Sequence, residues 1–113
     1  MTVVYHNPRC SKSRCSIEYL QNKGIEFKIA RYLETTLTVA ELTDIIGLLG
    51  IKPVELIRKV EDLYKSEYKG KMFSDAEWIQ IMAENPVLIE RPIVVHNNKA
   101  VVARPVEKID DIL

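Results

Sequence analysis

Cys10 is the residue of this chain whose surroundings most clearly indicate chemistry. It lies in Tyr5-His6-Asn7-Pro8-Arg9-Cys10-Ser11-Lys12-Ser13-Arg14-Cys15, between a short apolar run and an amphipathic segment. A strand that turns through Asn-Pro and delivers a cysteine to a helix start places the sulfur beside free backbone N–H groups and the positive end of the helix dipole. Arg9, Lys12 and Arg14 add positive charge within four residues. Both effects lower a thiol pKa, so we predict that Cys10 is a nucleophilic thiolate facing an anion.

For each of three residues near Cys10, the sequence allows two interpretations. Arg14 lies one helical turn further on, where it can hold an oxyanion beside the sulfur or stay solvated. His6 can tune the thiolate or simply brace the loop. Cys15 follows in a C-x4-C spacing, which is not the C-x-x-C redox motif. A five-residue offset turns it away on a straight helix, so a packed thiol is favoured over a group that resolves oxidised Cys10.

Composition limits the classes of function. Sixteen basic residues balance sixteen acidic ones among 113, so nothing in the overall charge points to nucleic acid or an anionic membrane. No apolar run approaches the roughly 20 residues that span a bilayer, and the N-terminus is not typical of a signal peptide. Two cysteines and two separated histidines make no convincing metal set. We expect a soluble cytoplasmic protein, in which two nearby cysteines are redox or catalytic groups rather than a structural disulfide, with small buried hydrophobic residues as the alternative.

The elements that position Cys10 follow from hydrophobic periodicity. Thr2–Tyr5 is a β-branched and aromatic run typical of a buried strand. A helix is predicted from about Ser13 to Lys23, ending at Gly24. Alternation over Ile25–Ala30 predicts a second strand. Because a helix separates the two strands, we expect a parallel βαβ unit.

The middle of the chain is predicted to be helical. Thr38 with Glu41, and Ser74 with Glu77, are capping boxes that each begin a helix. The first helix is expected to end at Gly50 and the second at Asn85-Pro86. Shorter helices are expected from Pro53 and over 61–69. The predicted inner faces consist of Leu42, Ile45, Ile46 and Leu49 in the first helix, and of Trp78, Ile81 and Met82 in the second.

The end of the chain predicts a hairpin and a short helix. Ile93–Val95 is a strand candidate, Asn97-Asn98 a tight turn and Lys99–Arg104 the return strand. Pro105 begins a last helix. The predicted fold is α/β, a thioredoxin-like mixed four-stranded sheet with helices packed against it. We expect one domain over residues 1–113, with a helical insertion at about 38–85.

The motifs Y-H-N-P-R-C-S-K-S-R, L-I-R-K, and E-R-P-I-V-V followed by A-R-P occur in this order. Together they resemble the arsenate reductase (ArsC) family of glutathione- and glutaredoxin-linked enzymes, over essentially the whole chain. The resemblance implies a thioredoxin-like fold with a helical insertion, in agreement with the predicted elements.

The resemblance also implies roles for single residues. Taken alone, Arg58, Arg91 and Arg104 are surface arginines by default, and an X-Pro bond such as Arg91-Pro92 is usually trans. The implied roles are nucleophile for Cys10, lowering of the Cys10 pKa for His6, oxyanion binding for Arg58, Arg91 and Arg104, an anion-cradling loop for Ser13 and Arg14, and the family's cis-proline for Pro92.

The implied reaction is the reduction of arsenate to arsenite. The arginines bind arsenate, Cys10 forms a covalent thioarsenate, glutathione attacks as co-substrate, and glutaredoxin clears the mixed disulfide; no cofactor is bound. The run Arg58-Lys59-Val60-Glu61 departs from the family's usual asparagine-containing run. A glutathione-dependent reductase of another substrate stays open, as does an Spx-type regulator that binds RNA polymerase. Spx proteins usually rely on C-x-x-C, where Ser13 here replaces the second cysteine.

Overall fold

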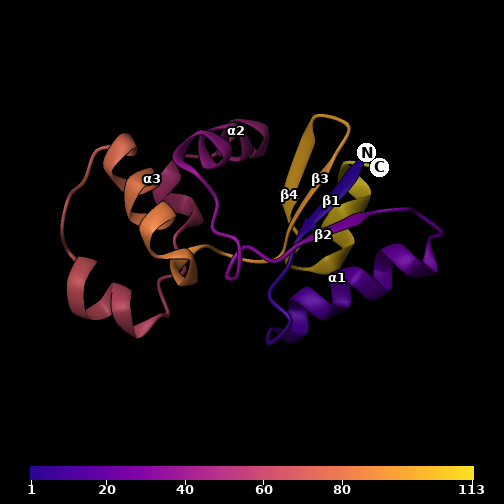
Figure 1. Ribbon diagram of the computed structural model, residues 1–113, viewed down its shortest axis with the longest axis horizontal. Coiled ribbons are helices and arrows are strands. Elements are labelled where there is room, and N and C mark those ends of the chain that lie inside the picture. Colours follow the sequence, from indigo (N-terminus) through magenta and orange to yellow (C-terminus); the bar gives the residue numbers. More distant parts are fainter. The chain divides into compact units, whose positions relative to one another are not determined.

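A mixed four-stranded sheet lies beside both ends of the chain (Figure 1). In the computed structural model, which describes residues 1–113, the strands are β1 (Thr2–Tyr5), β2 (Lys28–Ala30), β3 (Ile93–His96) and β4 (Lys99–Val102). Their order is β2-β1-β3-β4; β1 and β2 are parallel, and the other neighbours are antiparallel. Helix α1 (Ser11–Asn22) connects β1 to β2. The predicted α/β, thioredoxin-like sheet is confirmed.

The sheet belongs to one of two compact units, which we call the sheet unit (Met1–Thr35 with Arg91–Leu113) and the helical unit (Thr36–Glu90). The core of the sheet unit joins one face of the sheet to the helices: Val4, Val94 and Leu20 of α1 are fully buried together with Ile109 of the 3-10 helix η4 (Val106–Asp111). Leu20 of α1 and Val4 of β1 belong to one buried cluster, so hydrophobic packing holds together the two elements that the Cys10 loop connects.

The turns of the sheet unit agree with the sequence-based predictions at most positions. Asn97 and Asn98 take positive φ angles of 45° and 65°, as a two-residue hairpin turn requires. The Arg91-Pro92 bond is cis, as the resemblance implied. The Arg104-Pro105 bond is also cis, and nothing in the sequence had indicated it.

The helical unit contains two longer helices, α2 (Val39–Leu49) and α3 (Asp75–Glu84). Both predicted capping boxes are present: the N-cap oxygens of Thr38 and Ser74 accept from the N–H groups of Glu41 and Glu77, whose carboxylates accept in return. Short helices η1 (Pro53–Leu56), η2 (Tyr64–Tyr68, a π-helix) and η3 (Pro86–Leu88) complete the unit. The helical insertion at about 38–85 and the single domain over residues 1–113 both stay predictions.

Several element boundaries and one core residue differ from the predictions. Helix α1 begins at Ser11 rather than Ser13. Strand β2 begins only at Lys28, because the Ile25 N–H bonds to the Leu20 carbonyl and continues the helix end. Strand β4 ends at Val102 rather than Arg104. In α3, Ile79 is buried with Trp78 and Met82, whereas Ile81 is only half-buried, since positions 78, 79 and 82 share one face of a helix.

None of the helices has the length and apolar content that crossing a membrane requires.

Candidate active site

Cys10 is the N-cap residue of α1, with φ −97° and ψ 121°. Its carbonyl accepts the first helical hydrogen bond from the Arg14 N–H at 3.1 Å, and its own N–H donates to the Asn7 carbonyl at 3.0 Å. The residue is 8% exposed. Cys10 is therefore held where the unpaired N–H groups of a helix start face its side chain.

The pKa of the Cys10 thiol lies below its ordinary value. Burial raises this pKa, but the opposing groups outweigh burial: the backbone N–H groups of Ser13 and Lys12 and the guanidinium of Arg91 all stabilise the thiolate. The sulfur is consequently a better nucleophile at neutral pH than a free cysteine.

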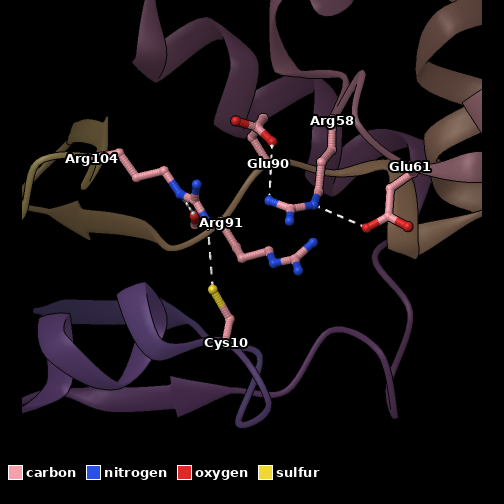
Figure 2. A network of polar contacts seen from close by, with 6 residues as sticks. All are labelled: Cys10, Arg58, Glu61, Glu90, Arg91 and Arg104. Carbon is pink, nitrogen blue, oxygen red and sulfur yellow. Dashed lines mark hydrogen bonds and ion pairs between the residues drawn. The ribbon is translucent and has the colours of Figure 1, made fainter.

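Arg104 lies directly beside the sulfur. Its Nη2 is 3.5 Å from Cys10 Sγ, and its Nε donates to the Arg91 carbonyl at 2.6 Å (Figure 2). Arg91 precedes the cis-proline Pro92 at the start of β3, and Arg104 follows the end of β4. The sheet unit thus brings Cys10, Arg91 and Arg104 together, although Cys10 lies more than eighty residues before either arginine.

The loop before Cys10 is organised around the fully buried hydroxyl of Ser13. Ser13 Oγ accepts from the Asn7 N–H at 3.0 Å and is hydrogen-bonded to His6 Nδ1 at 2.6 Å. The Asn7 side chain in turn accepts from the Arg9 N–H at 3.0 Å. These bonds use the Ser13 side chain inside the protein, so its backbone N–H is the group left to face the sulfur.

The pKa of the His6 imidazole lies below its ordinary value. Burial lowers its pKa, and the guanidinium groups of Arg31 and Arg14 lower it further. A neutral imidazole adds no positive charge beside the thiolate. The contact by which His6 acts on the loop is its hydrogen bond to Ser13.

Arg14 and Cys15 both lie on the exposed side of α1. The Arg14 Nη1 donates to the Pro8 carbonyl at 3.0 Å and so ties the helix to the loop before it. Cys15 is an exposed free thiol, which corrects the prediction of a packed one. The reason is its place on the helix, because the buried positions of α1 are Ser13, Ser16 and Leu20.

Arg58 belongs to the helical unit, where two carboxylates hold it. Its Nε is 2.9 Å from Glu61 Oε1 and its Nη1 is 3.8 Å from Glu90 Oε1 (Figure 2). Its backbone N–H donates to the Leu88 carbonyl at 2.7 Å. Arg58 was a candidate site residue from the sequence, but the binding of its side chain by Glu61 and Glu90 was not predicted.

Two further loop residues were missed by the sequence reasoning. Asn7 is buried and bonds to the loop on both sides, and Asn before Pro is a turn signal that pointed to it. Arg31, which follows β2, acts on His6, and only the parallel pairing of β1 and β2 places it there. No group of three His, Cys, Asp or Glu side chains is arranged to hold a metal ion.

The fold and the cysteine in the loop between β1 and α1 define a thioredoxin-like protein with its candidate nucleophile at a helix N-terminus. Comparison with known proteins makes the class specific. The model of the ArsC family matches residues 5–112. The chain therefore belongs to the ArsC family.

Individual relatives match nearly end to end. The chain is 45% identical over 112 residues to "Uncharacterized protein YfgD" of Escherichia coli K12, covering 97% of this chain and 94% of that protein. It is 42% identical over 113 residues to the "Arsenate reductase" of Haemophilus influenzae, with 98% and 97% covered. A solved structure described as arsenate reductase from Vibrio cholerae superposes with a TM-score of 0.94 at 45% identity, covering 99% of this chain and 97% of that one.

Proposed function

We propose that this protein is an arsenate reductase in which the Cys10 thiolate attacks arsenic. The observation that carries the proposal is the Cys10 sulfur, with its lowered pKa, lying 3.5 Å from the Arg104 guanidinium. A thiolate beside a fixed cation suits a reaction in which a nucleophile must approach an oxyanion, because the cation offsets the repulsion between them. Relatives named arsenate reductase at about 40% identity support the same substrate.

The first step forms a sulfur–arsenic bond. Arg91 and Arg104 of the sheet unit bind arsenate, and the Cys10 thiolate attacks As(V). Arg58 keeps in this proposal the oxyanion-binding role that the family resemblance implies. One arsenate oxygen takes up a proton and leaves as hydroxide, which yields a Cys10 thioarsenate. Arsenic remains As(V) at this stage. The planar arginine fork is suited to holding the remaining oxygens of a tetrahedral oxyanion.

The second step transfers two electrons. The thiolate of glutathione, the co-substrate, attacks the thioarsenate, a sulfur–sulfur bond forms between Cys10 and glutathione, and the electron pair of the sulfur–arsenic bond passes to arsenic. Arsenic leaves as As(III), which is arsenite after protonation. The thiol of glutaredoxin then exchanges with the Cys10–glutathione disulfide and restores the Cys10 thiolate.

His6 and Ser13 act in this scheme as positioning residues. Their bond fixes the loop so that the N–H groups of Ser13 and Lys12 point toward the sulfur. Arg14 supports the same loop through the Pro8 carbonyl.

The test is arsenite production from arsenate with glutathione and glutaredoxin present. We expect the wild-type protein to form arsenite and Cys10→Ser to fall to the background rate. Cys15→Ser is the matched control, because it removes the exposed thiol from the same helix, and it should retain activity. Equal rates for the wild type and Cys10→Ser would refute the proposed function.

A further inference from the structure

Arg58 is held between two acidic side chains of its own unit. Glu61 Oε1 lies 2.9 Å from its Nε, and Glu90 Oε1 lies 3.8 Å from its Nη1. The three side chains are mostly shielded, with 19%, 25% and 28% of their surfaces exposed for Arg58, Glu61 and Glu90. Figure 2 shows the guanidinium between the two carboxylates. Pairs this shielded are weakened less by solvent and salt than pairs on an open surface.

The backbone holds this arrangement in place. Ile57 and Ile89 form an antiparallel bridge, the Arg58 N–H donates to the Leu88 carbonyl, and the Glu90 N–H donates to the Leu56 carbonyl. Arg58 and Glu90 therefore follow two paired bridge residues. Glu61 adds a bond three residues after Arg58, where its own N–H also donates to the Arg58 carbonyl. The carboxylates are thus part of the local fold of the Arg58 segment.

Glu61 occupies a hydrogen-bond donor that an oxyanion needs. An arginine binds a tetrahedral anion through two parallel N–H groups, either Nε with one terminal nitrogen or the two terminal nitrogens. Because Glu61 accepts the Nε–H, the first arrangement requires its displacement. The second arrangement remains, but Glu90 lies near one of its nitrogens.

The charges of the three side chains lead to the same conclusion. One arginine (+1) and two glutamates (−2) give a formal charge of −1. We propose that Glu61, with Glu90, sets the oxyanion selectivity of Arg58 by disfavouring doubly charged anions more than singly charged ones. The inference rests on the proposed role of Arg58 in oxyanion binding. Glu61 is a positioning residue in this proposal: it accepts the Arg58 Nε–H, and its charge repels the anion that Arg58 holds.

Coulomb repulsion predicts the size of the effect. The repulsion between a carboxylate and an anion scales with the charge of the anion, so its free energy for a dianion is twice that for a monoanion. Removing the Glu61 charge should tighten sulfate binding about tenfold and perchlorate binding about threefold, for a partly screened pair. The two anions are both tetrahedral, so shape alone does not produce the difference.

The experiment compares sulfate and perchlorate binding by calorimetry in the wild type and Glu61→Gln. The amide oxygen of glutamine can still accept the Arg58 Nε–H, so the substitution removes charge while keeping a partner. Sulfate should gain more affinity than perchlorate, and in the arsenate assay KM should fall by a larger factor than kcat changes. Glu67→Gln makes the same charge change at an exposed position of the helical unit and should alter neither affinity by more than about twofold.

A second variant separates this inference from the proposed function. In Arg58→Ala, sulfate binding should weaken, and adding Glu61→Gln to it should no longer tighten binding. If Arg58→Ala binds sulfate as the wild type does, the proposed role of Arg58 itself is wrong. If Arg58→Ala weakens binding while Glu61→Gln leaves it unchanged, weakens it, or tightens both anions equally, only the selectivity proposal is overturned.

Discussion

The pKa of Cys10 depends on groups from distant parts of the chain. Burial raises it, and the N–H groups of Ser13 and Lys12 lower it together with the side chain of Arg91. The position of Arg14 in the sequence suggested a cation beside the sulfur, but its guanidinium donates a hydrogen bond to the Pro8 carbonyl instead. The lowered pKa of the thiol is therefore a property of the folded loop and strand ends. Single substitutions should measure how much each group contributes to it.

Arg91→Ala should raise the pKa of the Cys10 thiol, because it removes a hydrogen-bond donor and a positive charge that favour the thiolate. The measurement is the pH dependence of iodoacetamide alkylation, made in a Cys15→Ser background so that only Cys10 reacts. Arg14→Ala should shift the pKa less than Arg91→Ala does. A larger shift in Arg14→Ala would show that local sequence charge dominates.

The lowered pKa of Cys10 also predicts how stability depends on pH. The native thiol loses its proton at a lower pH than the unfolded chain, whose cysteine pKa is about 8.5. The resulting stabilisation is fully present above the unfolded-state pKa and is lost as the pH falls through the folded-state pKa. The free energy of unfolding of the wild type relative to Cys10→Ser should therefore rise with pH across this window. Urea titrations at several pH values test it, and a difference independent of pH would contradict it.

Ser13→Ala should destabilise the protein by about 1–3 kcal/mol, because it leaves the Asn7 N–H and His6 Nδ1 without their buried partner. Urea unfolding measures the loss. Ser11→Ala is the matched control, since Ser11 is an exposed residue of the same helix, and it should stay within about 0.5 kcal/mol of the wild type. Similar losses for both variants would refute a bracing role of the Ser13 hydroxyl.

The secondary-structure elements were predictable wherever short-range chemistry determines them. The capping boxes at Thr38 and Ser74 begin α2 and α3 as expected, and Asn97-Asn98 forms the hairpin turn. The predicted start of β2 was wrong. Ile25 fits the alternating pattern of a strand, but its N–H bonds to the Leu20 carbonyl at the end of α1. A periodic pattern of apolar residues indicates which side chains are buried, but it does not show which hydrogen bonds the backbone makes.

Substitution by alanine should change the stability of the protein in opposite directions at two glycines, one inside α2 and one directly after it. Gly50 follows the helix with φ +67°, whereas Gly47 lies inside it, and an added Cβ would meet no atom within 4 Å at either position. Gly47→Ala should stabilise the protein by about 0.5–1 kcal/mol, and Gly50→Ala should destabilise it by about 1 kcal/mol or more. Thermal or urea unfolding checks the signs; a gain in Gly50→Ala would contradict the left-handed helix end.

The candidate site was only partly accessible from the sequence. Cys10 could be predicted from its own neighbours, because a helix N-terminus is a local feature. Arg91 and Arg104 acquired a role only through family resemblance, since the bond from Arg104 Nε to the Arg91 carbonyl depends on how β3 and β4 pair. The contact of Glu90 with Arg58 was not predictable, because it depends on the bridge between Ile57 and Ile89.

Across the whole chain, the sheet unit and the helical unit should unfold in one transition. A chain of 113 residues lies within the size range in which single cooperative unfolding is usual. Fluorescence of Trp78, the only tryptophan, reports on the helical unit. Pulsed alkylation of Cys10 in a Cys15→Ser background reports on the sheet unit. The two urea curves should coincide, and separate midpoints would show two domains instead of one.

The strand order β2-β1-β3-β4 has a consequence for how copies of the protein meet one another. Strands β2 and β4 are the open edges of the sheet, where unpaired backbone groups can recruit strands from other chains and lead to aggregation. Each of these strands begins with an exposed lysine, Lys28 and Lys99, and β2 is only three residues long. Short, charged edges disfavour such pairing. The sheet that supports Cys10 thus remains open at both sides while two lysines oppose its growth into larger assemblies.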